Sequence, residues 1–383
     1  MNSAYLAGEG KIREISHLRQ LTGANMVIFD QELSGSQVRN LEEAIGCKII
    51  DRTTLILDIF ARRARSKESI LQVELAMLNH KLPRLRNSSA NLARIKGGVG
   101  LKGGVGSRGP GEKKLETDRR HIEKRIEDIK RELRRVVEQR TVQRGSRTNS
   151  NVSNVAIVGY TNAGKSTLRN KLCQLASTNR FSKEGVLEAD MLFATLDTTI
   201  RSISLEDKRQ ITLSDTVGFI RNLPHELVEA FKSTLEEVTE ADLLLHVVDA
   251  SSKEALDQIK SVNTVLSSLE ARNKNTIILL NKIDRCSLES LREIKDYLQG
   301  EKVLEISAVE GTNLQELLRL IGNEIPSKAF LKEFVIPYEN QGIIALLHDE
   351  GKVLNTDYIE KGVSVKAMVS QELYRKVKSY EAV

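Results

Sequence analysis

The feature that most constrains the fold of this 383-residue chain is a glycine-rich loop between an apolar run and a helical pattern. The stretch "NVAIVGYTNAGKST" covers residues 154–167 and contains the spacing Gly-x-x-x-x-Gly-Lys-Ser. Gly159 and Gly164 allow the backbone to curl until its N–H groups surround an anion at the start of a helix. Such a loop needs a strand before it and a helix after it. The sequence therefore predicts a doubly wound α/β sheet that carries a phosphate-binding loop.

Side chains beside this loop are suited to a nucleoside triphosphate. Lys165 is predicted to reach the β- and γ-phosphates, and the Ser166 hydroxyl to bind Mg²⁺. A second hydroxyl ligand for Mg²⁺ is expected from the loop "LFATLDTTI", at Thr195. The strand-like stretch "ITLSDTVG" ends in Asp215 and Gly218, which suit a water-mediated contact with Mg²⁺ and a contact with the γ-phosphate.

Two later motifs indicate which base is bound. "IILLNKID" ends a predicted strand with Asn281, Lys282 and Asp284. The Asp284 carboxylate can accept both N–H groups on the N1/N2 edge of guanine, which adenine does not offer. "ISAVEG" supplies Ser307 and Ala308, whose backbone can meet the guanine O6. Because all these motifs occur in order, each at the end of a strand, the sequence predicts a GTPase and disfavours an ATPase.

Phe219 follows Asp215-Thr-Val-Gly218 where Ras-like enzymes have the glutamine that orients the attacking water. An aromatic ring cannot orient water, so we expect slow intrinsic hydrolysis. Asn162 resembles the phosphate-loop asparagine of potassium-stimulated GTPases, which indicates a K⁺ site. The alternative is a hydrogen bond that only stabilises the loop.

Positive charge is concentrated in one region. The formal net charge is +6, but residues 91–150 contain 17 Lys and Arg against 8 Asp and Glu, and the remainder is slightly acidic. Apolar residues at four-three spacing over 71–82 and 122–136 predict an antiparallel helical hairpin, with its first helix running from about residue 55 to Pro83. The glycine-rich tip contains "KGGVG" twice. It is either a passive, solvated linker or a contact for a polyanion.

The small N-terminal region combines strands and helices. "ANMVIFD" (24–30) and "CKIID" (47–51) are typical of buried strands, and 34–46 of a helix with the capping-box spacing of Ser34 and Gln37. The predicted fold class is α/β throughout, with four regions: an α/β subdomain over 1–65, the hairpin over 66–145, the phosphate-loop sheet over 152–326, and a small α+β domain over 328–383.

Composition excludes some classes of protein. No apolar run reaches about 18 residues, so no spanning helix is expected, and the first residues lack the apolar region of a signal peptide. Cys47, Cys173 and Cys286 are far apart and indicate ordinary thiols rather than a metal site. We expect a cytoplasmic protein, with or without loose membrane association, that is a monomer and does not bind DNA.

Several long stretches resemble the HflX family of ribosome-associated GTPases. They are "SRGPGEKKLETDRR", "LFATLD", "GYTNAGKST", the run over 28–85 beginning "IFDQELSGSQVRNLEEAIG", and "IPYENQGIIALLHDEGKVL" near the C-terminus. The resemblance implies a GTPase that binds the large ribosomal subunit and its RNA, is stimulated by the ribosome, and dissociates stalled or stress-arrested ribosomes.

The resemblance also implies site residues. The Mg²⁺ ligands are Ser166 and Thr195, and Lys165, Thr195, Asp215 and Gly218 are expected to take part in catalysis. The expected contacts with phosphate or base are Gly159, Tyr160, Thr161, Asn162, Ala163, Gly164, Lys165, Ser166, Phe193, Ala194, Thr195, Leu196, Asp197, Asp215, Thr216, Val217, Gly218, Asn281, Lys282, Ile283, Asp284, Ser307, Ala308 and Val309.

The chain departs from the family pattern at a few places. Lys113 stands where the family usually has threonine, Thr198 where it has proline, and the glycine loop is longer than usual. The first residues resemble an internal segment of the family's first domain, so a strand and a helix of that domain are expected to be missing. A second hypothesis for the function is an RNA-binding ribosome-assembly factor in which GTP is a bound switch.

Overall fold

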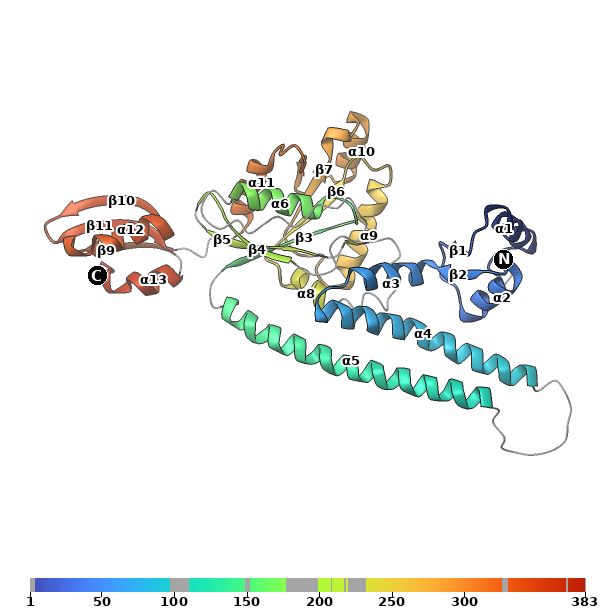
Figure 1. Cartoon of the computed structure of the whole chain (residues 1–383). Helices are drawn as coiled ribbons and strands as arrows, with labels where there is room; N and C mark the ends of the chain where they lie inside the picture. Colours follow the sequence, from blue (N-terminus) through green and yellow to red (C-terminus); the bar gives the residue numbers. More distant parts are fainter. Residues whose placement is uncertain are drawn as a thin grey trace. The chain divides into compact units, whose positions relative to one another are not determined.

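The structure is a computed structural model (Figure 1), and it describes residues 4–96, 110–148, 152–176, 199–207, 209–216, 218–219, 232–325, 330–369 and 371–382. Among these residues, no helix is both long enough and apolar enough to cross a membrane. The chain divides into two compact units, Met1–Glu138 with Leu223–Lys232, and Gln139–Asn222 with Ser233–Val383. Cys47, Cys173 and Cys286 are half-buried.

The N-terminal region has the predicted α/β character. Helix α1 (Glu9–Thr22) and helix α2 (Gly35–Ile45) pack with a two-stranded parallel sheet, β1 (Met26–Phe29) and β2 (Lys48–Asp51). The capping box is confirmed: the Ser34 hydroxyl accepts from the backbone N–H of Gln37 at 3.3 Å, and the Gln37 side chain accepts from the N–H of Ser34 at 2.9 Å. The core consists of Ile12, Leu33, Leu41, Ile45 and Ile49.

The single helix predicted from about residue 55 to Pro83 is wrong. The chain forms α3 (Arg52–Arg63) and, after a break, α4 (Lys67–Lys96). Ser66 begins the second helix, because its hydroxyl accepts from the N–H of Ser69 at 3.1 Å. Pro83 lies inside α4 rather than ending it. The next residue, Arg84, holds this turn by donating to the Leu33 carbonyl at 3.1 Å and to the Asp51 carboxylate.

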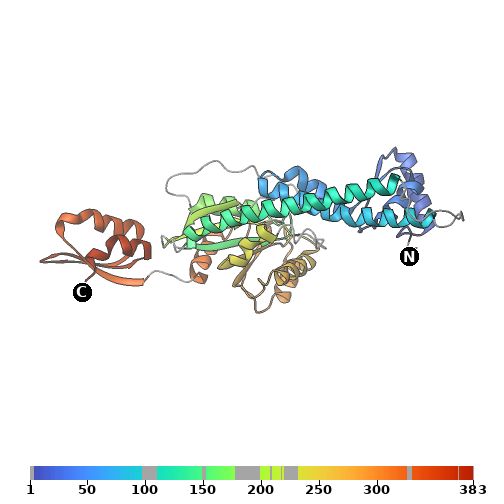
Figure 2. The same ribbon diagram turned by 90° about the horizontal axis from the view of Figure 1, so that it is seen from below.

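The helical hairpin is confirmed. Helix α5 (Pro110–Thr148) runs beside α4, as both Figure 1 and Figure 2 show. Side chains at the predicted spacing form the seam: Leu71, Leu75, Ile126 and Ile129 are buried, with Leu78, Leu82, Ile122 and Leu133 packed against them. Arg125 reaches across to the Glu74 carboxylate at 2.7 Å. The tip over 97–109 lies outside the described residues.

Both ends of α5 extend beyond the prediction. The sequence places Pro110 and Gly111 in a loop, yet they form the first turn of α5, where proline is tolerated because its missing N–H would have no partner there. The sequence predicts that the hairpin region ends at residue 145. The helix instead continues through Gly145 to Thr148, so its local composition does not end it.

The second unit contains the predicted doubly wound sheet. Its strand order is β4-β5-β3-β6-β7-β8, and all neighbouring pairs are parallel except β4–β5. The bounds are β3 (Ser153–Gly159), β4 (Thr199–Ser204), β5 (Gln210–Asp215), β6 (Leu243–Asp249), β7 (Thr276–Asn281) and β8 (Val303–Glu305). Parallel strands end at one edge of the sheet, which brings their C-terminal residues together.

Helices cover both faces of this sheet. Helix α6 (Lys165–Ala176) and α11 (Leu314–Glu324) share one core with alternate sheet residues such as Ile277 and Leu279. Helix α9 (Ala255–Ser268) and α10 (Leu288–Tyr297) share the other core with Ile278 and Leu280. The remaining elements are α8 (Lys232–Glu240) and the 3-10 turn η1 (Ile283–Arg285).

The C-terminal residues form the predicted α+β arrangement. An antiparallel sheet in the order β10-β11-β9 contains β9 (Phe330–Ile336), β10 (Lys352–Ile359) and β11 (Gly362–Val369). The sheet packs on α12 (Gln341–Glu350) and α13 (Gln371–Val377) through a core that includes Phe334, Leu347 and Val365. Two 3-10 turns, η2 (Tyr338–Asn340) and η3 (Lys378–Tyr380), complete it.

Candidate nucleotide-binding site

The glycine-rich loop follows β3 directly and opens into α6, as the sequence predicts. Gly159 has φ +148°, and a Cβ there would overlap the carbonyl oxygen of Val247 on β6. Gly164 has φ +95°, and a Cβ there would overlap the Asn281 side chain. Only glycine fits both positions. The loop is therefore built so that backbone amides, rather than side chains, line the start of α6.

Lys165 is buried at the start of α6 and folds back on the loop. Its Nζ donates to the carbonyl oxygens of Gly159 at 3.1 Å and Tyr160 at 2.8 Å. Burial lowers the pKa of Lys165 to about 8, and the nearby charge of Asp215 opposes that shift. An ammonium group held only by carbonyl oxygens in a buried pocket is well prepared to meet phosphate oxygens.

Ser166 and Asp215 meet at the end of β5. The Ser166 hydroxyl donates to Oδ2 of Asp215 at 2.8 Å, and Asp215 is fully buried. A hydroxyl beside a buried carboxylate is a set of hard oxygen donors, which is the chemistry that Mg²⁺ prefers. The two residues therefore fit the predicted Mg²⁺ contacts. The other predicted ligand, Thr195, lies outside the described residues, as do Phe193, Ala194, Leu196, Asp197 and Val217.

Gly218 and Phe219 pair with the phosphate loop. The N–H of Thr161 donates to the Phe219 carbonyl at 2.9 Å, and the N–H of Phe219 donates to the Gly159 carbonyl at 3.1 Å. A Cβ at Gly218 would lie 2.7 Å from Cγ2 of Thr161 and 3.0 Å from Nζ of Lys165, so glycine permits this approach. Phe219 is only 2% exposed. Its ring belongs to the core, which agrees with the expectation that it does not orient water.

Thr216, the residue that follows Asp215, is fixed to β3. Its hydroxyl donates to the Ile157 carbonyl at 2.8 Å, and it is fully buried. The contact anchors the chain to β3 directly after Asp215.

Asn281 ties the phosphate loop to the base-binding loops. Its Nδ2 donates to the Ala163 carbonyl at 2.8 Å, and its Oδ1 accepts from the N–H of Ala308 at 3.0 Å. Lys282 donates to the Asn162 carbonyl at 2.8 Å and to Oδ2 of Asp249 at 2.7 Å. Both residues therefore stiffen the pocket.

Asp284 occupies the turn η1 beside the predicted base-binding loop. Its Oδ1 accepts from the Ser307 hydroxyl at 2.6 Å, and its side chain is 15% exposed. The same Ser307 oxygen accepts from the N–H of Glu310 at 3.2 Å, so the serine orients both the carboxylate and the loop. Ile283 lies in the same turn, and Val309, 61% exposed, lies on the open side of the loop.

Sequence reasoning missed three polar groups around this site. Asp249 ends β6 exactly as Asp215 ends β5, so a carboxylate at the end of an apolar strand was an available signal. Arg169 on α6 contacts Oδ2 of Asp215 at 3.2 Å. His246 is buried on β6, and burial, followed by the charge of Lys165, lowers its pKa to about 4. Arg169 could not be found in this way, because a single charged residue in a helix gives no such signal.

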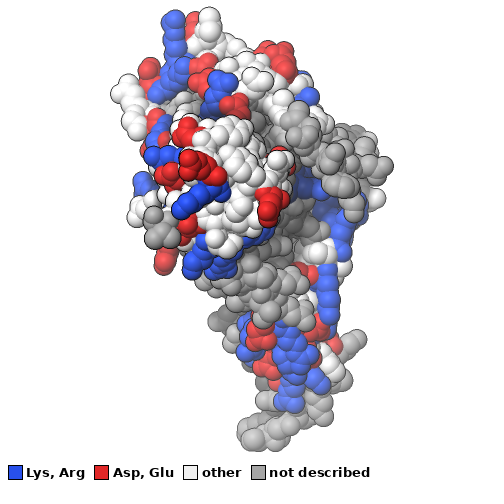
Figure 3. Space-filling model, turned by 90° about the vertical axis from the view of Figure 1, so that its left-hand side faces the viewer, with Lys and Arg blue, Asp and Glu red and all other residues white. Residues whose placement is uncertain are grey.

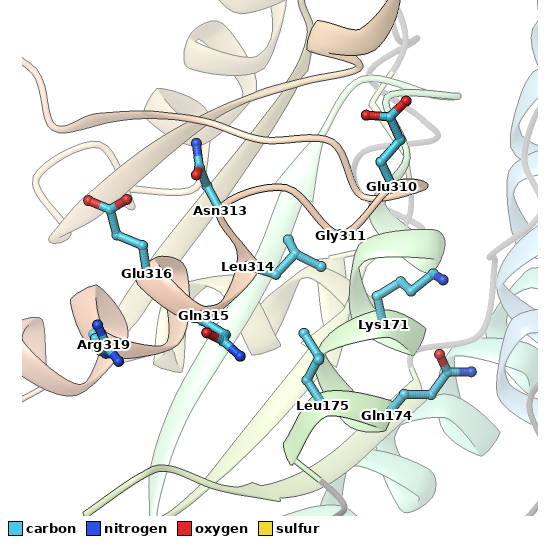
Figure 4. Close-up of a pocket in the computed structure, with 10 residues that line it drawn as sticks. All are labelled: Lys171, Gln174, Leu175, Glu310, Gly311, Asn313, Leu314, Gln315, Glu316 and Arg319. Carbon is cyan, nitrogen blue, oxygen red and sulfur yellow. The ribbon is translucent and has the colours of Figure 1, made fainter.

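A separate cavity of about 640 Å³ lies between α6 and α11 (Figure 4). Lys171 and Leu175 of α6 line one side, and Glu316 and Arg319 of α11 line the other. Among the residues that the structure describes, its lining includes none of the predicted nucleotide contacts. We assign the nucleotide to the loop at the strand ends, because that is where the backbone amides, Lys165 and the buried carboxylate converge.

Comparison with known proteins finds related GTPases. Family models match three segments: "GTP-binding GTPase N-terminal" over residues 1–61, "GTP-binding GTPase Middle Region" over 63–147, and "50S ribosome-binding GTPase" over 154–282. The chain is 46% identical over 380 residues to the GTPase HflX of Caldanaerobacter subterraneus subsp. tengcongensis, covering 99% of this chain and 84% of that one. It is 42% identical over 365 residues to the GTPase HflX of Escherichia coli, covering 95% and 82%.

A solved structure with some similarity is a GTP-binding protein from Sulfolobus solfataricus in complex with GDP. It is 24% identical, covers 85% of this chain and 86% of that one, and has a TM-score of 0.44.

Proposed function

This chain is a member of the HflX family of GTPases, and we propose that it uses GTP to bind the large ribosomal subunit and dissociate stalled or stress-arrested ribosomes. The chain is a GTP-binding, GTP-hydrolysing enzyme. The family membership supports the ribosomal partner, since the matched model of its GTPase region is described as ribosome-binding. Residues of this chain indicate which of its surfaces contacts the ribosome.

The observation that carries the proposal is a basic face on helix α5. Arg120, Lys124, Arg131 and Arg135 are exposed and share one side of the helix at steps of four and seven residues. The seam residues Ile126 and Ile129 lie on the other side. In the lower part of Figure 3, many Lys and Arg side chains lie among Asp and Glu side chains. We call these four residues the outer basic face.

Several of these cations already have carboxylate neighbours. Arg120 lies 3.4 Å from Glu116, and Arg131 lies 2.8 Å from Asp128. Both pairs are exposed, and such pairs contribute little to stability in water. They can therefore exchange the carboxylate for an RNA phosphate at small cost. The proposed contact extends to the tip with Lys102, Arg108, Lys113 and Lys114, which lie outside the residues whose side chains are described.

We propose that hydrolysis is slow until the ribosome stimulates it. Lys165 binds the β- and γ-phosphates, the Gly218 N–H binds the γ-phosphate, and Asp215 orients water around the metal. Ser166 and Thr195 would hold Mg²⁺, which neutralises charge on the phosphates. Phe219 supplies no group for the attacking water. We propose Asn162 as the ligand for an activating K⁺; this residue is exposed and has a left-handed backbone conformation (φ +62°).

The remaining proposals concern organisation. We propose four domains over 1–65, 66–145, 152–326 and 328–383, a monomeric state, and a cytoplasmic location.

The competing function is an assembly factor that holds GTP as a switch, and the buried Phe219 favours it because it leaves no water-orienting side chain at 219.

Sedimentation of intact ribosomes tests the proposal. Wild-type protein with GTP should produce free subunits, whereas the assembly-factor hypothesis predicts intact ribosomes with bound protein. Changing Arg120, Lys124, Arg131 and Arg135 together to Ala should flatten the log–log salt dependence of subunit binding by roughly three to four units. Changing Arg108, Lys113 and Lys114 to Ala should flatten it by roughly two to three units.

The matched control removes three exposed charges from the GTPase domain, Lys253, Lys260 and Arg272. It should leave the salt dependence unchanged. An unaltered slope in the outer-face variant would show that this face does not contact RNA. Binding without any free subunits would favour the assembly factor.

A further inference from the structure

Arg169 is a charged residue buried inside the GTPase domain. It lies on α6, four residues after Lys165, and is 3% exposed. Its Nη1 lies 3.2 Å from Oδ2 of Asp215, and its Nε and Nη2 donate to Oδ1 of Asn170 at 3.3 and 2.9 Å. Arginine is almost never buried to this extent unless it is paired. The guanidinium is therefore held in place on both edges, directed at the carboxylate.

The same carboxylate oxygen has two partners. Oδ2 of Asp215 accepts from the Ser166 hydroxyl and from Arg169. These are the oxygen groups that fit a Mg²⁺ ion, so the cation of Arg169 lies against the group that the metal needs. A second positive charge beside a metal site opposes the metal, because like charges repel strongly where solvent is excluded.

We propose that Arg169 is a positioning residue: it acts as an internal counter-ion for Asp215 when the pocket holds no Mg²⁺, and it competes with Mg²⁺ for that carboxylate. This inference rests on the proposed use of Mg²⁺.

Other charges near the site do not take this role. Lys165 is held by the Gly159 and Tyr160 carbonyls and is reserved for phosphate. Arg201 on β4 influences the same helix, because both it and Arg169 act to lower the pKa of Cys173, which burial raises. Arg169 is distinguished by its direct contact with Asp215.

The test measures binding of a fluorescent GDP analogue to the full chain at a series of buffered free Mg²⁺ concentrations. We compare wild type with Arg169→Met, which removes the charge, and Arg169→Lys, which keeps it. Lys171→Met is the control, because Lys171 lies on the same helix and lines the separate cavity. Arg169→Met should lower the Mg²⁺ concentration at half-saturation by on the order of tenfold. Arg169→Lys should stay near wild type, and Lys171→Met should match it.

A residue with only a structural role would weaken binding equally at all Mg²⁺ concentrations, and an unchanged half-saturation point in Arg169→Met would overturn the inference. If Arg169→Met does not fold, Arg169→Gln serves, since it is neutral but keeps an N–H donor, and the same shift is expected. A wild-type protein whose GDP binding ignores Mg²⁺ would instead contradict the proposed metal site. The two failures are therefore distinct.

Discussion

Two buried aspartates show how the same local pattern can serve a scaffold or a binding site. Asp51 ends β2 and Asp215 ends β5, both at the C-terminal end of a parallel strand and both almost completely buried. Each is paired with an arginine, Arg84 or Arg169. Each also accepts from a hydroxyl, that of Thr54 at 2.5 Å or that of Ser166 at 2.8 Å.

The difference lies in what else holds them. Asp51 accepts from the backbone N–H groups of Leu33 at 3.2 Å and Thr54 at 3.0 Å, which cannot move without unfolding. Burial acts to raise the pKa of Asp51, but the interactions with His80 and Thr54 hold it well below the usual value. Ser166 and Arg169, by contrast, contact Asp215 through side chains of the phosphate-loop helix. A carboxylate bonded to backbone N–H groups suits a scaffold, whereas a carboxylate beside the phosphate loop suits a site that binds ligands.

The largest effect is expected when the network around Asp51 is disrupted. Arg84→Met leaves the Asp51 carboxylate buried without its cation, which should lower the free energy of unfolding of the N-terminal region by about 3–5 kcal/mol. Native-state hydrogen exchange at the Leu33 and Thr54 amides measures this loss. The control is Arg62→Met, which removes an exposed charge from the neighbouring helix. Adding Asp51→Asn should restore part of the loss, and equal stability of the Arg84 and Arg62 variants would refute the scaffold role.

The next effect concerns Asp284, whose side chain is partly exposed. Asp284→Asn replaces a double acceptor with a group that is partly a donor, so GTP affinity should fall by about 2–4 kcal/mol. Binding of xanthosine triphosphate should improve, because its C2 oxygen is an acceptor. Equilibrium titration with both nucleotides measures the change, with Asp296→Asn on the exposed face of α10 as control. A variant that still prefers GTP as strongly as wild type would show that Asp284 does not read the base.

A smaller effect depends on pH. His246 has a pKa lowered to about 4, against 6.5 for the ordinary side chain, because it is buried near Lys165. Between these values the unfolded chain binds more protons than the folded chain, so stability is present above pH 6.5 and is lost as pH falls toward 4. The loss attributable to His246 should reach about 3 kcal/mol at most.

The measurement is chemical unfolding of the GTPase domain within the full chain at several pH values. His246→Leu should be less sensitive over this window than wild type, and the difference isolates the histidine from the carboxylates that titrate there too. Identical pH profiles would mean that His246 is not held neutral by its surroundings.

The smallest expected effect is on catalysis. Phe219→Gln should retain ribosome-stimulated hydrolysis within a few-fold, because the side chain at 219 lies in the core and does not reach the attacking water. Single-turnover hydrolysis with large subunits measures this, with GTP binding recorded in parallel. Loss of stimulated hydrolysis with intact GTP binding would assign the side chain a catalytic role.

Local chemistry explains what the sequence could predict. The Ser34 capping box, the β1 and β2 strands, the hairpin seam and the phosphate loop all depend on residues close together in the chain, so their spacing alone reveals them. The break between α3 and α4 could not be seen in this way. Pro83 lies inside a helix, and the next residue, Arg84, is held by Asp51 and Leu33, which are more than thirty residues away in sequence.

The same distinction between local and tertiary determinants applies to the residues of the candidate site. Lys165, Ser166, Asp215, Asn281 and Asp284 could be found because each belongs to a motif with a fixed order. Arg169 could not, since an arginine in a helix is normally solvated, and its burial is decided by a carboxylate 46 residues farther along the chain. Tertiary partners, rather than local spacing, determine such residues.

Hydrogen–deuterium exchange on the intact chain, with and without GDP and Mg²⁺, tests the central claim most directly. We expect the amides of Asn162, Gly164, Lys165 and Ala308 to gain protection when nucleotide binds. The amides of Leu33 and Thr54 beside Asp51 should keep the protection that they already have. Nucleotide-dependent protection around Asp51, with none in the phosphate loop, would contradict the assignment of one region as scaffold and the other as binding site.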